Sequence, residues 1–243
     1  MVALPLCHTS QFPRMPSSYD WRFILTPEEI LKEIAEQTQV CMKCNLHYSR
    51  KNAVPGVGNP EAKVLFIGEG PGFHENEQGL PFVGAAGTFL DELLGDAGLT
   101  REGVFITNVV KCRPPGNRDP QVEELDACKP YLERQIAAIN PDVIVTLGRF
   151  SMGHFINNGK ISSIHGMEFW SHGRMVIPMY HPAAALHQPS LRSVVKDDFS
   201  KLPALIEKAQ ESRKGESYLY DAADISQTEN PAEENDAEQL SLF

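Results

Sequence analysis

Three polar side chains of this 243-residue chain lie where short apolar runs end, and together their types could do chemistry. Glu69 lies in the glycine-rich motif GEGPG, Asn108 lies within one apolar run, and His181 follows another. A carboxylate, an amide and an imidazole can exchange hydrogen bonds with a bound small group and stabilise charge on it. These residue types indicate a binding or catalytic site built from distant parts of the chain.

The elements that must position these side chains are predicted by the alternation of two patterns. Apolar runs typical of buried parallel strands occupy residues 64–67, 104–110, 143–147 and 175–179. Helical patterns lie between and after them, at about 84–98, 120–139, 150–157 and 195–211. This alternation predicts a three-layer α/β fold, whose ligands bind at the carboxyl ends of the strands. We expect Glu69, Asn108 and His181 to converge there.

The start of the folded part is predicted from helix signals. Thr26 is suited to the N-cap, Pro27 to the first helical position and Glu29 to a capping box, so residues 1–26 are expected to be irregular. Residues 45–62 contain glycine and proline, and they predict a loop.

The formal net charge of −10 is spread unevenly along the chain. Residues 215–243 contain eight acidic and no basic residues, which leaves 24 acidic and 22 basic residues before them. Residues 27–214 are therefore predicted to be one near-neutral domain that can carry a basic face, with Lys111, Arg113 and Arg118 as candidates. The acidic tail has the composition of a disordered segment.

The cysteines form another candidate site. Cys41 and Cys44 make a CxxC pair, and Cys112 and Cys128 follow from a second region, while Cys7 is expected to be a spare. Four thiolates can enclose a metal ion or an iron–sulfur cluster, although buried core thiols and a zinc site are alternative interpretations. No apolar run is long enough to span a bilayer, and no secretion signal is recognised, so we expect a cytoplasmic protein with reduced thiols.

Besides the cysteine spacing, the chain contains four motifs, GEGPG at 68–72, GLPFVGAAG at 79–87, NVVKCRPPGNR at 108–118 and HPAAAL at 181–186. Together these features resemble the family 4 uracil-DNA glycosylases, the iron–sulfur branch of their superfamily. The resemblance implies a three-layer αβα sandwich around a four-stranded parallel sheet. It also implies a monomeric, monofunctional hydrolase that flips uracil out of single- or double-stranded DNA and leaves an abasic site. A structural [4Fe–4S] cluster on Cys41, Cys44, Cys112 and Cys128 is implied as well, with no metal needed for the chemistry.

The resemblance assigns base recognition to three residues. Phe82 would stack on the flipped base, and Asn108 would select uracil over cytosine because an amide matches the O4 acceptor and the N3–H donor of uracil. His181 would donate a hydrogen bond to uracil O2 as negative charge develops there. The alternatives are a core phenylalanine, an asparagine bonded to its own backbone and a structural histidine.

The resemblance also implies roles in specificity or in positioning water for two glutamates and one glycine. Glu75 would lie against C5 of uracil and exclude the methyl group of thymine, and a surface glutamate is the alternative. Glu69 would hold its loop or orient water. Gly70 matches a position where the best-known family of the superfamily has a water-positioning aspartate, so the general base is unassigned.

The segment after His181 is implied to contact DNA. Residues 182–186 resemble the family's minor-groove loop, in which Ala183 would contact DNA and Leu186 or a neighbour would wedge into the gap left by the base. Arg192 is a candidate for a phosphate contact.

The last five residues, QLSLF, resemble the pentapeptide by which bacterial replication proteins bind the β sliding clamp. Gln239 would hydrogen-bond at the groove, and Leu240, Leu242 and Phe243 would fill apolar pockets. A chance apolar end is the alternative.

Two rival functions remain open from the sequence. One is a superfamily member that binds abasic sites covalently or without turnover, and the other is an iron–sulfur electron-transfer module.

Overall fold

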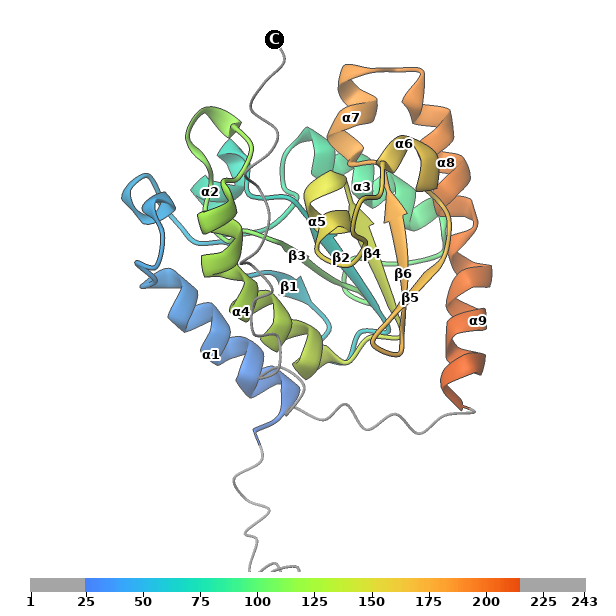
Figure 1. Cartoon of the computed structure of the whole chain (residues 1–243), viewed down its shortest axis with the longest axis horizontal. Coiled ribbons are helices and arrows are strands. Elements are labelled where there is room, and N and C mark those ends of the chain that lie inside the picture. The colour runs from blue at the N-terminus through green and yellow to red at the C-terminus, as the bar shows by residue number, and fades with distance from the viewer. Residues whose placement is uncertain (1–24, 215–243) are drawn as a thin grey trace, which may run out of the picture.

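The computed structural model of the chain describes residues 25–214, which fold around one six-stranded sheet (Figure 1). The strands are β1 (Val57–Gly58), β2 (Val64–Gly68), β3 (Phe105–Asn108), β4 (Val143–Leu147), β5 (Phe169–Ser171) and β6 (Arg174–Met179). Their order across the sheet is β1-β3-β2-β4-β6-β5. The predicted disordered tail at 215–243, Cys7 and nearly all of the irregular segment 1–26 lie outside the described residues.

The four central strands, β3, β2, β4 and β6, are parallel, as the apolar runs predicted. The two edge strands, β1 and β5, pair antiparallel with their neighbours, and the sequence did not predict them. Strands of two and three residues are too short to show a hydropathy period, so only their pairing partners define them.

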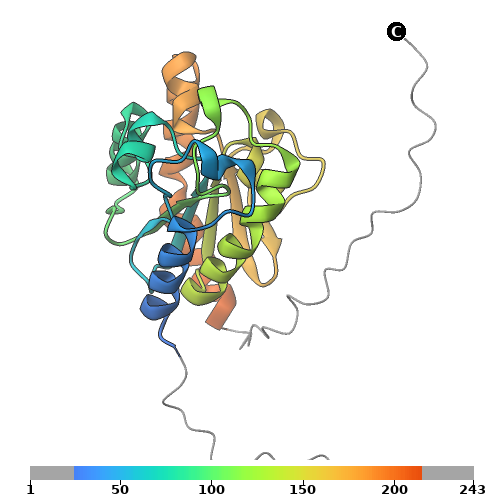
Figure 2. The same cartoon turned by 90° about the vertical axis from the view of Figure 1, so that its left-hand side faces the viewer.

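Helices cover both faces of the sheet and complete the predicted sandwich. The longer helices are α1 (Pro27–Gln39), α3 (Ala85–Asp96), α4 (Val122–Ile139), α8 (Leu191–Ser200) and α9 (Leu202–Lys214). Figure 2 shows α1 and α4 side by side on one face, and α3, α8 and α9 pack on the other. Short segments connect them: η2 (Asn45–Tyr48), α2 (Phe73–Gln78), η3 (Pro115–Asn117), α5 (Arg149–Gly153), α6 (Ile161–Ile164) and α7 (Pro182–His187).

Strand β2 shows why the sheet must be covered on both faces. Val64 and Phe66 belong to the apolar core beneath α3, α8 and α9, whereas Leu65 and Ile67 belong to the core beneath α1 and α4. All four side chains are buried, which is the pattern of a strand inside an α/β protein.

The helix ends agree with the local sequence signals. Thr26 caps α1, its side chain and that of Glu29 form the predicted capping box, and Pro27 is the first helical residue. The single helix expected at 195–211 is instead two helices, α8 and α9. Pro203 explains the break, because it has no N–H to continue the hydrogen bonding of α8 and its ring crowds the preceding turn.

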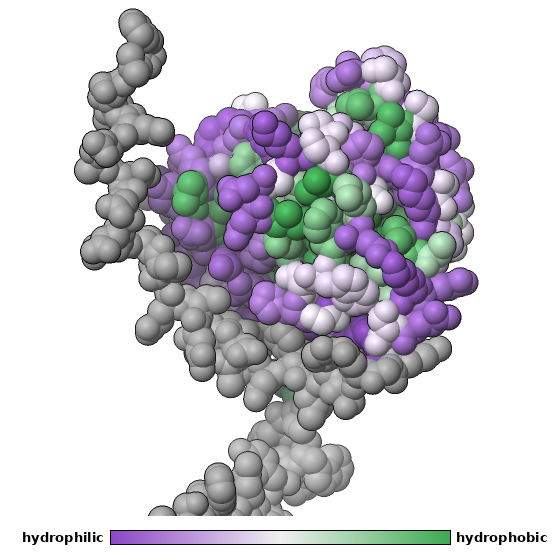
Figure 3. Space-filling model, turned by 45° about the vertical axis from the view of Figure 1, so that its right-hand side comes forward, coloured by the Kyte–Doolittle hydropathy of each residue, from purple (hydrophilic) through white to green (hydrophobic). Residues whose placement is uncertain are grey.

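Some large hydrophobic side chains are exposed to solvent. Among them are Trp170, which lies on the edge strand β5, and Met167, which lies just before it. Figure 3 shows one face on which hydrophobic residues gather near the centre and hydrophilic residues surround them. In the part of the chain that is described, no helix is both long enough and apolar enough to cross a membrane.

Candidate active site

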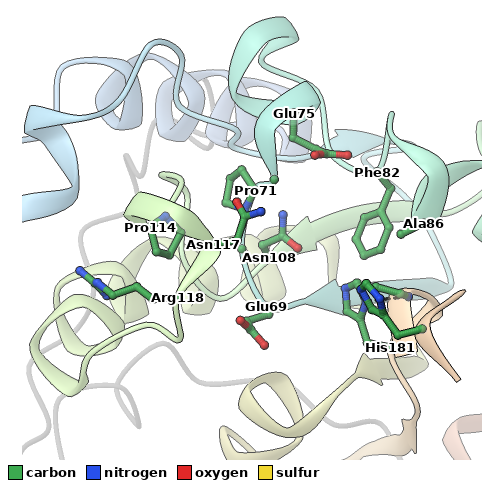
Figure 4. A pocket seen from close by; sticks show the side chains of 14 residues that line it. Glu69, Pro71, Glu75, Phe82, Ala86, Asn108, Pro114, Asn117, Arg118 and His181 are labelled. Carbon is green, nitrogen blue, oxygen red and sulfur yellow. Dashed lines mark hydrogen bonds between the residues drawn. The ribbon is translucent and has the colours of Figure 1, made fainter. Parts of the chain in front are cut away.

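The carboxyl ends of β2, β3 and β6 surround a cavity of about 400 Å³ (Figure 4). The structure brings Glu69, Asn108 and His181 together in this cavity, although they are far apart in the sequence. Its other lining residues are Gly70, Pro71, Gly72, Glu75, Phe82, Ala86, Pro114, Asn117, Arg118, Ala183 and His187. The cavity therefore contains most of the residues that the sequence motifs indicated.

Asn108 contributes a buried side-chain oxygen that has no hydrogen-bond partner among the described residues. It is the last residue of β3, where it pairs with Gly68 of β2, and it is only 2% exposed. Its Oδ1 atom is buried and has no hydrogen-bond partner among the described residues. A buried acceptor without a partner costs free energy, so this atom is poised to accept a hydrogen bond from a bound ligand.

Lys111 fixes the backbone of Asn108 through a hydrogen bond to its carbonyl oxygen. The sequence placed Lys111 on a basic surface, and this was wrong, because the side chain is 1% exposed. Its Nζ atom donates at 2.7 Å to each of three oxygens, Asn108 O, Thr107 Oγ1 and Gln135 Oε1. Burial lowers the pKa of Lys111 to about 7, but three acceptors match the three donors of an ammonium group. The end of β3 is thus fixed to α4.

Phe82 lies opposite Asn108 on a loop with a demanding backbone. Its φ of 53° is left-handed, which is rare for a large residue. Two glycines leave room for Phe82, Gly68 for its ring and Gly87 for its backbone. A Cβ atom on Gly68 would lie 2.8 Å from Phe82 Cζ, and one on Gly87 would overlap the Phe82 carbonyl. The ring stacks near His181, with a centroid separation of 5.4 Å and an interplanar angle of 24°.

Glu75 and Arg101 hold the Phe82 loop from two sides. Glu75 Oε1 accepts hydrogen bonds from the N–H groups of Val83 at 2.9 Å and Gly84 at 3.0 Å. Arg101 Nη2 donates to the Phe82 carbonyl at 2.9 Å. One carboxylate oxygen of Glu75 thus already binds the Phe82 loop. The contact with a base that the sequence predicts for Glu75 would have to be made alongside this structural role.

His181 is held as a neutral imidazole. Burial lowers its pKa to about 4, and the nearby negative charge of Glu75 only partly opposes this effect. Its Nδ1 atom accepts a hydrogen bond at 3.1 Å from the N–H of Ala183, in the first turn of α7. A neutral ring that accepts at Nδ1 must carry its proton on Nε2, so His181 has one N–H to donate.

Glu69 and Gly70 line the cavity directly after the end of β2. Burial raises the pKa of Glu69, the negative charge of Asp119 raises it further, and Arg149 opposes both. A Cβ atom on Gly70 would lie 2.7 Å from a methyl carbon of Val110, so a side chain there would require Val110 to shift.

The expected DNA contacts after His181 fall on a helix and not on a loop. Residues 182–186 lie in α7, in which Ala183 lines the cavity and Leu186 is exposed. Arg192 lies outside the cavity lining. Its guanidinium donates to Glu92 at 2.6 Å and lies 4.3 Å from the centre of the Phe89 ring. Its positive charge is already paired.

The four cysteines of the second candidate site line one small cavity beside α4. Cys112 and Cys128 are buried, whereas Cys41 and Cys44 are half-buried. The Cys112 sulfur accepts a hydrogen bond from Arg50, and the Cys128 sulfur accepts one from the backbone of Lys111, both at 3.5 Å. Within residues 25–214, no three His, Cys, Asp or Glu side chains are arranged to hold a metal ion.

The fold is that of an α/β protein with a polar-lined cavity at the carboxyl ends of its parallel strands. The sequence profile of the uracil DNA glycosylase superfamily matches residues 55–205, so the chain belongs to this superfamily. Its relatives include the type-4 uracil-DNA glycosylase of Sulfurisphaera tokodaii, with 48% identity over 72% of this chain and 84% of that protein. The type-4 enzymes of Archaeoglobus fulgidus (48%) and Thermotoga maritima (45%) each cover 75% of this chain and 96% and 98% of their own lengths.

Proposed function

We propose that this protein is a monofunctional uracil-DNA glycosylase, which hydrolyses the N-glycosidic bond of uracil in DNA and leaves an abasic site for repair. The family of the chain and the names of its relatives support this function. The unpartnered Oδ1 atom of Asn108 in the cavity is the structural observation that carries it. A base must leave the helix to reach so buried a group, which is the strategy of enzymes that act on bases.

Asn108 is proposed to read the edge of the flipped base. Its Oδ1 would accept the N3–H of uracil, and its Nδ2 would donate to O4. Cytosine presents the reverse pattern at these positions, so both hydrogen bonds would be lost. Phe82 lines the same cavity and offers an aromatic surface for the base.

His181 is proposed to stabilise the departing base. Its Nε2–H would donate to uracil O2, where negative charge grows as the glycosidic bond breaks. Such a bond strengthens in the transition state and therefore raises the rate. Glu75 would keep Phe82 in place through its two backbone hydrogen bonds. Glu69 would orient water towards the sugar cation after bond breaking has begun.

The test is cleavage of a uracil-containing oligonucleotide, followed by alkaline scission at abasic sites. Wild-type protein should produce strand breaks at uracil, and intact DNA would contradict the proposed activity. Retention of the labelled strand on the protein through denaturation would instead favour covalent abasic-site binding. Asn108→Asp should gain activity on cytosine, and a variant with unchanged discrimination would refute the proposed base readout.

The four cysteines are proposed to hold a [4Fe–4S] cluster. A single zinc ion gathers its sulfurs at about 2.3 Å from one centre, whereas each iron of a cluster takes one thiolate and spreads them apart. Four thiols around one cavity, with hydrogen bonds to two of the sulfurs, fit the cluster. It would stabilise the loops that join α1, β3 and α4. Purified protein should absorb broadly in the visible range, and zinc without iron would refute the assignment.

The sliding clamp of bacterial replication is proposed as a partner of Gln239, Leu240, Leu242 and Phe243, which lie outside the described residues. A cytoplasmic, monomeric protein is part of the same proposal. Deleting residues 239–243 should abolish binding to purified clamp and leave uracil excision intact. Unchanged clamp binding would refute this partner.

A further inference from the structure

The rim of the active-site cavity contains an exposed aromatic ring that the uracil chemistry does not use. Phe73 follows Gly72, which lines one wall of the cavity, and 53% of Phe73 is exposed. A phenylalanine this exposed loses the gain of burial, so its position at the mouth of a site is informative. His74 packs edge-on against the ring, at 5.5 Å between centroids, and restricts its motion.

Arg113 reaches Phe73 from the neighbouring loop, which follows β3. It precedes Pro114, which lines the cavity, and its guanidinium lies 5.4 Å from the centre of the Phe73 ring. Its Nε atom donates to Asn117 Oδ1 at 2.8 Å, which anchors the side chain. The Phe73–Arg113 pair therefore joins the segments that follow β2 and β3, next to cavity-lining residues of both.

The guanidinium group of Arg113, unlike those of nearby arginines, has no carboxylate partner among the described residues. Nearby arginines are paired with carboxylates: Arg118 with Glu124, and Arg149 with Asp119. Within residues 25–214, Arg113 makes no ion pair, and only its Nε atom has a hydrogen-bond partner. Its two Nη groups can thus bind an anion without first breaking an ion pair.

We propose that the Phe73–Arg113 pair is a subsite for the nucleotide next to the uracil in the same strand. Phe73 stacks on the base of that nucleotide, and Arg113 binds its phosphate. An aromatic face combined with a cation is the combination that proteins use to bind unpaired nucleotides irrespective of sequence. This inference rests on the proposed function and specifies the substrate further, as a strand whose flanking base is unpaired or unstacked.

The decisive experiment is a double-mutant cycle between Phe73 and the flanking base. Single-stranded substrates carry uracil with either a normal neighbour or a tetrahydrofuran abasic analogue, on the 5′ or the 3′ side. For the wild type, the analogue on one side should lower kcat/KM about tenfold. Phe73→Ala should lose about as much on the normal substrate and nothing further on the analogue. Phe73→Leu, which keeps the apolar volume, should behave like Phe73→Ala.

The control is Trp170→Ala, on the edge strand β5, where 47% of the residue is exposed. It should leave both substrates unaffected. Equal losses for Phe73→Ala on both substrates, or a wild type indifferent to the neighbour on either side, would overturn the proposal.

Binding separates this inference from the proposed function. A strand with 2-aminopurine beside the uracil should fluoresce less when bound to wild-type protein than when bound to Phe73→Leu, whether or not uracil is released. Equal fluorescence with both proteins, from either side, would overturn the subsite. Arg113→Gln should reduce the salt dependence of binding by about one phosphate contact, and an unchanged slope would remove Arg113 from it.

Discussion

The neutral state of His181 makes a prediction about acid that differs from the behaviour of an ordinary histidine. Its pKa is lowered to about 4 by burial, from an ordinary value of 6.5. At pH 5.5, a group with a pKa of 4 is about 97% neutral, whereas one with a pKa of 6.5 is only about 9% neutral. A second proton would lie on Nδ1 and would break the hydrogen bond from the Ala183 N–H that orients the ring. We therefore expect uracil release to keep its His181-dependent rate at pH 5.5, about tenfold above that of an ordinary histidine.

The same shift predicts a loss of stability in acid. Between pH 6.5 and 4, the unfolded chain binds a proton at His181 that the folded chain does not, so stability falls as the pH falls. At pH 5 the loss is about 2 kcal/mol relative to neutral pH. His181→Asn has no such proton, so its stability deficit relative to the wild type should shrink by that amount in urea unfolding.

The assay is single-turnover uracil release between pH 5 and 8, combined with ¹⁵N shifts of the histidine ring. The shifts should show a protonated Nε2 and a bare Nδ1 at pH 6. Glu69 also has a perturbed pKa, so Glu69→Gln serves as the control for its titration. An activity midpoint near 6.5 that persists in Glu69→Gln, or an imidazolium at pH 6, would refute the reasoning.

Three further substitutions test the supports of the cavity. Gly68→Ala should lower kcat/KM about a hundredfold with the fold retained in circular dichroism, because the new methyl group displaces both Asn108 and Phe82; near-normal kinetics would contradict this packing. Lys111→Met leaves three acceptors without their donor and should destabilise the protein by roughly 3 kcal/mol in denaturant unfolding. A neutral effect would mean that water replaces the amine. Glu75→Gln keeps an acceptor for the Phe82 loop, so it should retain more activity than Glu75→Ala, and equal losses would point to the charge instead.

The central sheet was predictable because its signal is local. Each parallel strand is buried on both faces, so its apolar run is visible in the sequence itself. The cavity residues were predictable because glycine-rich and polar motifs interrupt these runs at the strand ends. The sequence alone thus indicates that Asn108 and His181 lie at one edge of the sheet.

Other features depend on partners that no local pattern reveals. The burial of Lys111 is decided by acceptors from Thr107, Asn108 and the distant Gln135. Arg192 of α8 forms an ion pair with Glu92 of α3. This pairing occupies the positive charge that the sequence suggested for a contact with a DNA phosphate. The sequence did not predict helix α7, because residues 182–186 resemble a segment that is a loop in the family.

The dependence of the cavity on Lys111 and Gly68 has a consequence for how the protein folds. Lys111 bonds to Gln135 of α4, and Gly68 of β2 pairs with Asn108 of β3, so these contacts close long loops and form late. A partly folded chain could keep its helices and even its central strands while the Phe82 loop and the end of β3 stay unformed. Excision activity should therefore return after refolding later than the circular dichroism signal, which makes it a stringent reporter of the completed native state.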